Sequence, residues 1–109
     1  MKLPNADRAI VDIEKLRAYC LNPAHARGRH KARTFASKLG LSAADAEYLR
    51  DLLLAAAKSQ EATVGEEDRY GRRYVIDFPV SRADKRATVR STWILRRGED
   101  VPRLTSCYL

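Results

Sequence analysis

The sequence predicts an α+β fold, in which three N-terminal helices pack on a C-terminal, mainly antiparallel four-stranded sheet. Up to Gln60 the apolar residues recur at the spacing of one helix face, whereas after Gln60 they alternate with polar residues. Turn-like segments divide the second half into four strand candidates. The 109 residues are expected to form a single domain, 1–109, mainly helical over 1–60 and mainly strand over 61–109.

Three segments of the first half have the apolar spacing and end signals of helices: Ile13–Leu21, His30–Leu39 and Ala43–Lys58. Asp12 precedes the first segment as an N-cap, and Gly40 ends the second. Ser42 and Asp45 form a capping box that opens the third. The apolar face of the second helix is expected on Ala32, Phe35, Ala36 and Leu39, and that of the third on Leu49, Leu52, Leu53 and Ala56.

The second half contains four predicted strands, over Ala62–Glu66, Arg72–Val80, Arg86–Arg97 and Pro102–Leu109. Alternation gives each long strand one mostly apolar face, which would pack on the helices, and one polar face. The polar face is a candidate binding floor, although an ordinary solvated sheet has the same pattern. The apolar face would comprise Tyr74, Ile76, Phe78, Val80, Val89, Trp93, Leu95, Leu104 and Tyr108. The polar face would comprise Arg73, Asp77, Arg90, Thr92, Arg103 and Thr105. In the last strand Cys107 alternates with Leu104 and Tyr108.

Charge is concentrated in one stretch of the first half. The chain has 21 Lys and Arg against 14 Asp and Glu, a net charge of +7. The window Lys15–Ala44 contains seven of the basic residues and no acidic one, so it accounts for the whole excess. Such a local excess predicts a surface for a polyanion, with nucleic acid as the leading candidate. The predicted RNA contacts are Arg27, Arg29, Arg33, Lys38, Arg73 and Arg103.

Both histidines of the chain, His25 and His30, lie inside this basic window. Two imidazoles among cations suit acid–base chemistry on a polyanion, and a surface or hydrogen-bonding role is the ordinary alternative. Their spacing, with no adjacent Cys, Asp or Glu, does not fit a zinc site, and no metal or cofactor is expected. RNA supplies its own nucleophile, the 2′-OH, so His, Lys, Arg and hydroxyl groups can cleave it without metal. DNA cleavage usually needs metal-held carboxylates, which the window lacks.

Lys31 stands in the first turn of the second predicted helix, beside the apolar face. Its stem could lie along the core edge while its ammonium group reaches into a cleft. The helix N-terminus adds a partial positive charge and free N–H groups, which suit a phosphate. A basic helix start that only solubilises the surface is the simpler alternative.

The cysteines, the hydropathy and the N-terminus of the sequence indicate the cellular compartment. Cys20 and Cys107 lie 87 positions apart, without metal-ligand spacing, and are predicted to be buried thiols. No apolar run approaches the roughly 20 residues that a membrane span needs. The N-terminus lacks the pattern of a signal peptide, so the expected setting is cytoplasmic, without a membrane partner.

Three motifs extend over nearly the whole chain: Lys15–Phe35 with Leu39-Gly40-Leu41, Arg69-Tyr70-Gly71 with Ala87–Ile94, and Pro102–Tyr108. Together they resemble a family of uncharacterised bacterial domains, which occur as small free-standing proteins and at the C-termini of polymorphic toxins. The helices-then-sheet layout is similar to the barnase–EndoU–colicin–RelE group of metal-independent ribonuclease toxins. In this chain Ala26 stands where many relatives have proline. The motif positions of the family fall on His25, Gly28, His30, Lys31, Arg90, Trp93 and Thr105.

The resemblance implies a ribonuclease toxin of a toxin–antitoxin or toxin–immunity pair, with tRNA among the candidate substrates. It implies that His25 or His30 is the general base or acid, that Lys31 and Arg90 stabilise the transition state, and that Thr105 positions the phosphate. The implied partner is a small, acidic neutralising protein that covers the cleft. Two alternatives stay open: a non-catalytic module that binds RNA or an acidic protein, and an antitoxin or immunity-type protein.

Overall fold

The computed structural model describes residues 1–109 and has the predicted α+β architecture, with the helices first and the strands after them. The helical elements are η1 (Ala6–Arg8), α1 (Ile13–Lys15), η2 (Leu16–Cys20), α2 (Arg29–Leu39), η3 (Ala43–Asp45) and α3 (Ala46–Ser59). The strands are β1 (Thr63–Asp68), β2 (Gly71–Arg82), β3 (Lys85–Arg96) and β4 (Arg103–Tyr108). No helix has both the length and the apolar character that crossing a membrane requires.

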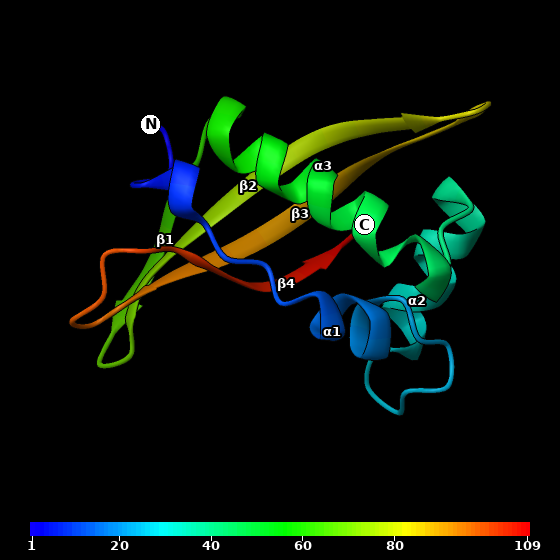
Figure 1. Ribbon diagram of the computed structural model, residues 1–109, viewed down its shortest axis with the longest axis horizontal. Coiled ribbons are helices and arrows are strands. Elements are labelled where there is room, and N and C mark those ends of the chain that lie inside the picture. The colour runs from blue at the N-terminus through cyan, green and yellow to red at the C-terminus, as the bar shows by residue number, and fades with distance from the viewer.

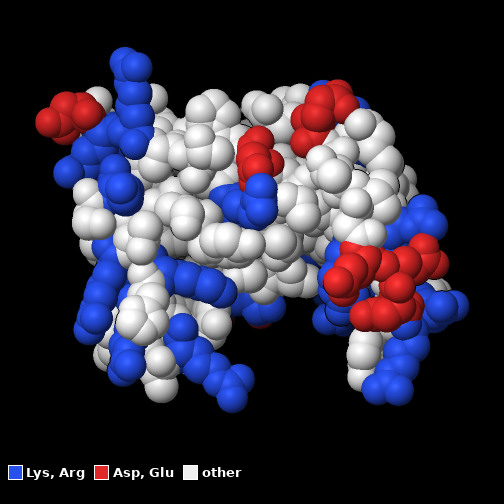
Figure 2. Space-filling model, turned by 180° about the vertical axis from the view of Figure 1, so that it is seen from behind, with Lys and Arg blue, Asp and Glu red and all other residues white.

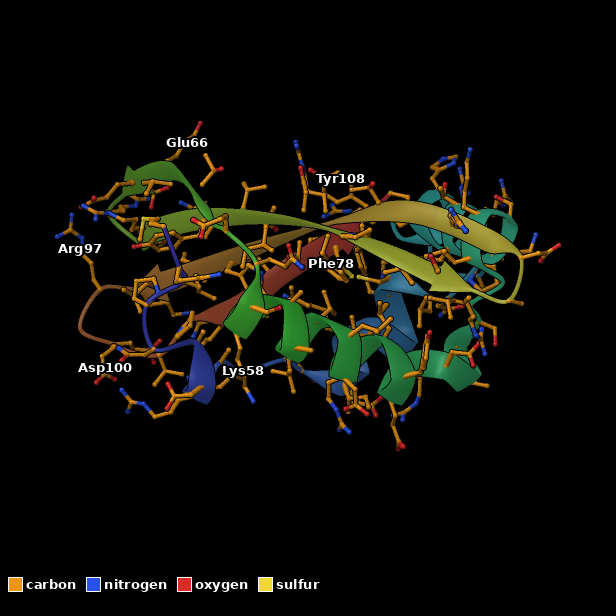
Figure 3. All side chains as sticks on the ribbon, turned by 90° about the horizontal axis from the view of Figure 1, so that it is seen from above. Lys58, Glu66, Phe78, Arg97, Asp100 and Tyr108 are labelled. Carbon is orange, nitrogen blue, oxygen red and sulfur yellow. The ribbon has the colours of Figure 1, made fainter.

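The four strands form one antiparallel sheet in the order β1-β2-β3-β4. Helix α3 lies across one face of this sheet, whereas α1 and α2 gather at one end, beside β4 (Figure 1). The opposite face carries no covering helix over its centre (Figure 3). We call this the open face. The arrangement agrees with the predicted packing of an apolar sheet face on helices.

The core confirms most of the predicted alternation. Tyr74, Ile76, Phe78 and Val80 of β2 are buried, as are Val89 and Trp93 of β3, and they join buried leucines of α3 in one hydrophobic cluster. One buried polar group, Ser91, accepts a hydrogen bond from Trp93 Nε1 at 2.9 Å and donates one to the Ile76 carbonyl at 2.8 Å. The Trp93 indole is therefore structural, as predicted.

The helix signals are largely confirmed. The Asp12 carboxylate accepts the Glu14 N–H at 3.0 Å, and the Ser42 N–H donates to Asp45 at 2.9 Å. Gly40 ends α2 with φ of +66°, the left-handed conformation expected of a C-terminal glycine. The first predicted helix is wound differently from expectation, because η2 continues α1 as a π-helix. Three predicted core positions also differ, since Ala36 is exposed and Leu52 and Leu95 are only half-buried.

Strand β4 departs from the predicted alternation at Thr105. Trp93 pairs with Leu104 and Thr92 pairs with Ser106, so Thr105 is an extra residue without its own partner in β3. This β-bulge shifts the register by one residue. Every later residue of β4 therefore points to the face opposite to the one that simple alternation predicts.

The bulge reverses the placement that alternation gives to two residues. Cys107, which alternation would put with Arg103 and Thr105, pairs with Ser91 and is fully buried, in agreement with its prediction as a buried thiol. Tyr108, which was expected in the core, pairs with Arg90. Its side chain lies on the open face, whereas Phe78 points toward α3 (Figure 3). The bulge thus places a cysteine under the site described below and a tyrosine on its surface.

Candidate functional site

The ammonium group of Lys31 is the best-fixed cation of the basic window. Its Nζ donates a hydrogen bond to Ser106 Oγ at 2.8 Å. It also lies 4.9 Å from the centre of the Tyr19 ring and 5.6 Å from that of Tyr108, within cation–π range of both. Lys31 is half-buried, with no acidic partner. This agrees with the predicted lysine whose stem follows the core edge and whose charge reaches a cleft.

Two adjacent pockets meet at this lysine. The first, about 530 Å³, lies between η2, the loop after it and β4, and contains His25 and Thr105. The second, about 260 Å³, contains His30 and Tyr108. Lys31 lines both pockets. The structure therefore brings four of the five predicted catalytic residues to one region, divided between two neighbouring hollows.

His25 is held in place by its own loop. Its Nδ1 accepts hydrogen bonds from the backbone N–H groups of Arg27 and Gly28, both at 3.0 Å. Since Nδ1 acts as an acceptor, the ring proton resides on Nε2, which is left to meet a ligand as a donor. The ring also packs edge-to-face on Tyr19, at 4.7 Å between centroids. His25 is thus a positioned hydrogen-bond donor.

Gly28 allows this loop to lie directly on η2. A Cβ added at Gly28 would stand 2.1 Å from the Tyr19 carbonyl oxygen, a backbone atom that cannot easily move away. The close approach keeps the His25 turn and the Tyr19 ring in contact. A glycine at this position is therefore a packing requirement of the first pocket.

His30 differs from His25 in its surroundings. It is exposed in the first turn of α2, and neither of its ring nitrogens has a hydrogen-bond partner within the protein. It lines the second pocket beside Thr34 and Tyr108. Both ring nitrogens of His30 are therefore available to a ligand, whereas His25 offers only Nε2.

Thr105, the bulged residue, is tied to its neighbours. Its hydroxyl lies 2.6 Å from Thr92 Oγ1 and donates to the Thr92 carbonyl at 3.0 Å. Its own carbonyl accepts a hydrogen bond from Lys15 Nζ at 3.2 Å. Thr105 therefore shapes the floor of the first pocket and fixes a second lysine at its wall.

Arg90 stands apart from Lys31. Its guanidinium makes a bidentate ion pair with Asp77, at 2.8 and 2.9 Å, on the open face. Hydrogen bonding from Arg90 lowers the pKa of the Asp77 carboxyl, and Asp77 raises the pKa of Arg90 in turn. A separate hollow of about 310 Å³ adjoins this pair. Tyr108, the register partner of Arg90, lies between Arg90 and the two pockets.

The predicted RNA contacts fall into two groups. Arg27, Arg29, Arg33 and Lys38 are exposed on the loop and on α2, and none has an acidic partner. Arg73 and Arg103 are instead paired with Asp68 at 2.7 Å and Glu99 at 3.2 Å, near the opposite end of the sheet. In Figure 2 the lobe at lower left is blue without red, whereas the lobe at lower right mixes both colours. The structure thus does not bring Arg73 and Arg103 to the basic window.

Three residues that surround Lys31 are not apparent as site residues from the sequence: Tyr19, Ser106 and Tyr108. Tyr19 lies within the first of the three motifs, which does not by itself give it a role. Ser106 and Tyr108 face Lys31 because of the bulge, and strict alternation concealed this. A break in alternation, with the two polar residues Thr105 and Ser106 in succession, is the signal that could have indicated it.

The two buried cysteines lie together beneath the first pocket. The Cys107 thiol, by hydrogen bonding, lowers the pKa of Cys20, and the nearby Lys31 and Lys15 ammonium groups act in the same direction. The same contact and burial raise the pKa of Cys107. Both thiols are free, and the prediction that they are buried is confirmed. No group of three or more His, Cys, Asp or Glu side chains is arranged to hold a metal ion.

Residues 2–109 match the model of a family described as a domain of unknown function, DUF6883, and the chain belongs to that family. No curated protein and no solved structure matches the chain. The match covers the whole fold, including both pockets and the bulge.

Proposed function

We propose that this DUF6883 protein is a metal-independent endoribonuclease, acting as the toxin of a toxin–antitoxin or toxin–immunity pair in the cytoplasm, with tRNA among its candidate substrates. The observation that supports this most is the environment of Lys31. A fixed ammonium group, a donor imidazole at His25 and an imidazole at His30 without hydrogen bonds border two pockets that share Lys31. Unpaired cations surround them and suit a phosphate chain.

In the proposed reaction, His30 removes the proton of a ribose 2′-OH, and the 2′-oxygen attacks the adjacent phosphorus. The bond from phosphorus to the 5′-oxygen breaks, and this oxygen takes a proton from the Lys31 ammonium group. The products are a 2′,3′-cyclic phosphate and a free 5′-OH. Lys31 regains its proton from solvent, and His30 releases the one it accepted.

Other groups would act on the charge and the position of the phosphate. His25 Nε2–H would donate to a non-bridging oxygen, whose negative charge increases in the transition state. Thr105 would position the phosphate because it shapes the floor of the first pocket. Arg90 is already paired with Asp77, so this proposal gives it no direct part in the reaction.

The test uses a labelled single-stranded RNA and the purified protein. We expect His30→Ala and Lys31→Met each to lower the cleavage rate about 10²–10⁴-fold with the fold intact, and His30→Ala to leave RNA binding in place. Lys58→Met removes an equally charged side chain from the exposed end of α3 and should cleave normally. Cleaved RNA should carry 2′,3′-cyclic ends, and a 2′-deoxy residue at the cleavage position should block the reaction. Equal cleavage of RNA and its 2′-deoxy counterpart, or a Lys31→Met variant as active as the wild type, would refute the proposal.

A neutralising partner forms part of the proposal. The unpaired cations of the loop and α2 suit a small acidic protein as well as RNA. Expression of the chain alone should inhibit growth, and His30→Ala should relieve the inhibition. A chain that is harmless without its partner would contradict the toxin assignment.

A second candidate function is a non-catalytic module that binds RNA or an acidic protein. The specific observation that favours it is the commitment of His25 Nδ1 to the backbone of its own loop, a structural use of a histidine. A binder should tolerate His30→Gln without loss of affinity and should release no cleaved RNA. The enzyme should keep its affinity in the same variant and lose cleavage.

A further inference from the structure

We propose that the two pockets bind two consecutive nucleotides of one RNA strand, with one base in each pocket and the linking phosphate on Lys31. This inference rests on the proposed function, because it names the unit of RNA that the same site would bind. It adds that the recognised unit is a dinucleotide rather than an isolated phosphate or a single nucleotide.

The geometry that carries this inference is the sharing of one residue. Lys31 lines both pockets, and no other side chain does. Its ammonium group, hydrogen-bonded to Ser106, stands at the boundary between the hollows. A phosphate bound to that ammonium group would therefore have one hollow on each side. In a nucleic acid a phosphodiester joins two nucleosides, so one base lies on each side of it.

Each pocket also offers an aromatic ring near the shared cation. Tyr19 lines the first pocket and Tyr108 the second, and both rings are half-buried. Tyrosine rings are common stacking surfaces for bases that are not paired in a duplex. The rings lie 4.9 and 5.6 Å from Lys31 Nζ, so both bases would stand close to the linking phosphate.

The two hollows are unequal in a way that suits different bases. The first is the larger, about 530 Å³, and contains the carboxylates of Asp12 and Glu14. The second is about 260 Å³ and has no acidic side chain. Carboxylates accept hydrogen bonds from the amino groups of bases. The base in the first pocket is therefore one with an exocyclic amino group.

The test measures affinity without cleavage. The probe is a dinucleotide, UpA, with a 2′-O-methyl group on the uridine to remove the nucleophile, titrated by calorimetry. It places the adenine in the first pocket and the uridine, which carries the 2′-oxygen, in the second pocket with His30. The comparison ligands are uridine 3′-monophosphate and adenosine 5′-monophosphate. We expect the dinucleotide to bind at least about tenfold more tightly than either monophosphate, because it occupies both pockets.

Tyrosine variants locate the two bases. Tyr108→Leu should weaken dinucleotide binding about tenfold, whereas Tyr108→Phe keeps the ring and should bind normally. Tyr70→Leu removes an exposed tyrosine at the far hairpin and should also bind normally. Tyr19 packs on His25, so Tyr108 is the more informative position for a foldable variant. Affinity unchanged in Tyr108→Leu, or a dinucleotide no tighter than the monophosphates, would overturn the inference.

The outcomes separate this inference from the ribonuclease proposal. If RNA is cleaved but the dinucleotide gains no affinity, the enzyme stands and the two-base site fails. If the dinucleotide binds as expected but no RNA is cleaved, the two-base site stands and the catalytic assignment fails. A UpU probe, with 2′-O-methyl on the first uridine, that binds as tightly as UpA would refute the assignment of an amino-bearing base to the first pocket.

Discussion

Arginines at the two ends of this molecule have opposite surroundings. At the end formed by the basic loop and α2, Arg27, Arg29 and Arg33 are exposed without acidic partners. At the other end, Arg72 is hydrogen-bonded to Glu67 at 2.8 Å and Arg73 to Asp68 at 2.7 Å. Figure 2 shows the difference as a blue lobe and a mixed lobe.

The difference follows from how near an acidic residue lies along the chain. At the β1–β2 hairpin the sequence turns back within five residues, so each arginine meets a carboxylate of the adjacent strand. The loop and α2 lie within a window that contains no acid at all, and none of their arginines and lysines makes an ion pair. Unpaired cations keep their charge available to a polyanion, whereas paired ones are largely neutralised locally.

The largest expected effect comes from removing three charges at one end. Arg27, Arg29 and Arg33 changed together to Gln should weaken RNA binding at least about 10²-fold and lower the slope of log affinity against log salt by about 2. Arg72, Arg73 and Arg103 changed to Gln lose the same formal charge at the other end and should bind RNA almost normally. Filter binding across a salt series measures the affinity and the salt slope of each variant. Equal losses in the two triple variants would abolish the distinction between the ends.

Glycines provide a second comparison. Gly28→Ala should lower the free energy of unfolding by about 1–3 kcal/mol, because its Cβ would stand 2.1 Å from the Tyr19 carbonyl oxygen. It should also lower RNA cleavage by displacing His25. Gly65→Ala in β1 has only ordinary contacts, the nearest at 3.5 Å, and should leave stability and cleavage nearly unchanged. Urea denaturation measures the stability of the two variants, and the cleavage assay measures their activity. A Gly28→Ala protein with normal stability would show that the loop does not depend on close packing.

The smallest expected effect concerns Asp45, one of the few acids near the basic end. The Ser42 N–H and then Arg82 lower the pKa of its carboxyl. A lowered pKa in the folded state stabilises the protein above the unfolded pKa, near 3.8, and this contribution is lost as the pH falls through the folded pKa. Asp45→Asn should therefore cost about 1 kcal/mol at pH 7 and much less near pH 2. Thermal denaturation at the two pH values tests this, and a pH-independent cost would mean that the carboxylate charge is not what stabilises the cap.

Much of the fold could be predicted because its signals are local. Capping residues, the C-terminal Gly40 and the alternation of β2 each depend on neighbours a few positions away. The capping box of Ser42 and Asp45 is visible in the sequence and present in the structure. These features need no knowledge of tertiary contacts.

The site could be predicted only in outline. His25, Lys31 and Thr105 do share one pocket, but the sequence could not show that a backbone turn occupies His25 Nδ1. It could not show that Arg90 is engaged by Asp77, because the two residues are 13 positions apart and meet only when β2 and β3 pair. Nor could alternation reveal the proximity of Tyr108 to Lys31, since one extra residue in β4 reverses the faces beyond it.

The bulge at Thr105 also bears on insertions and deletions among relatives. Because Thr105 has no partner in β3, a relative that lacks it would keep Ser106, Cys107 and Tyr108 opposite the same residues of β3. Such a chain would lose only the Thr105 hydroxyl and the carbonyl that binds Lys15. A deletion at Cys107 would instead bring Tyr108 into a buried position sized for a thiol. Insertions and deletions in this strand are therefore expected at Thr105. They are not expected at the residues that follow it, where the register with β3 must be kept.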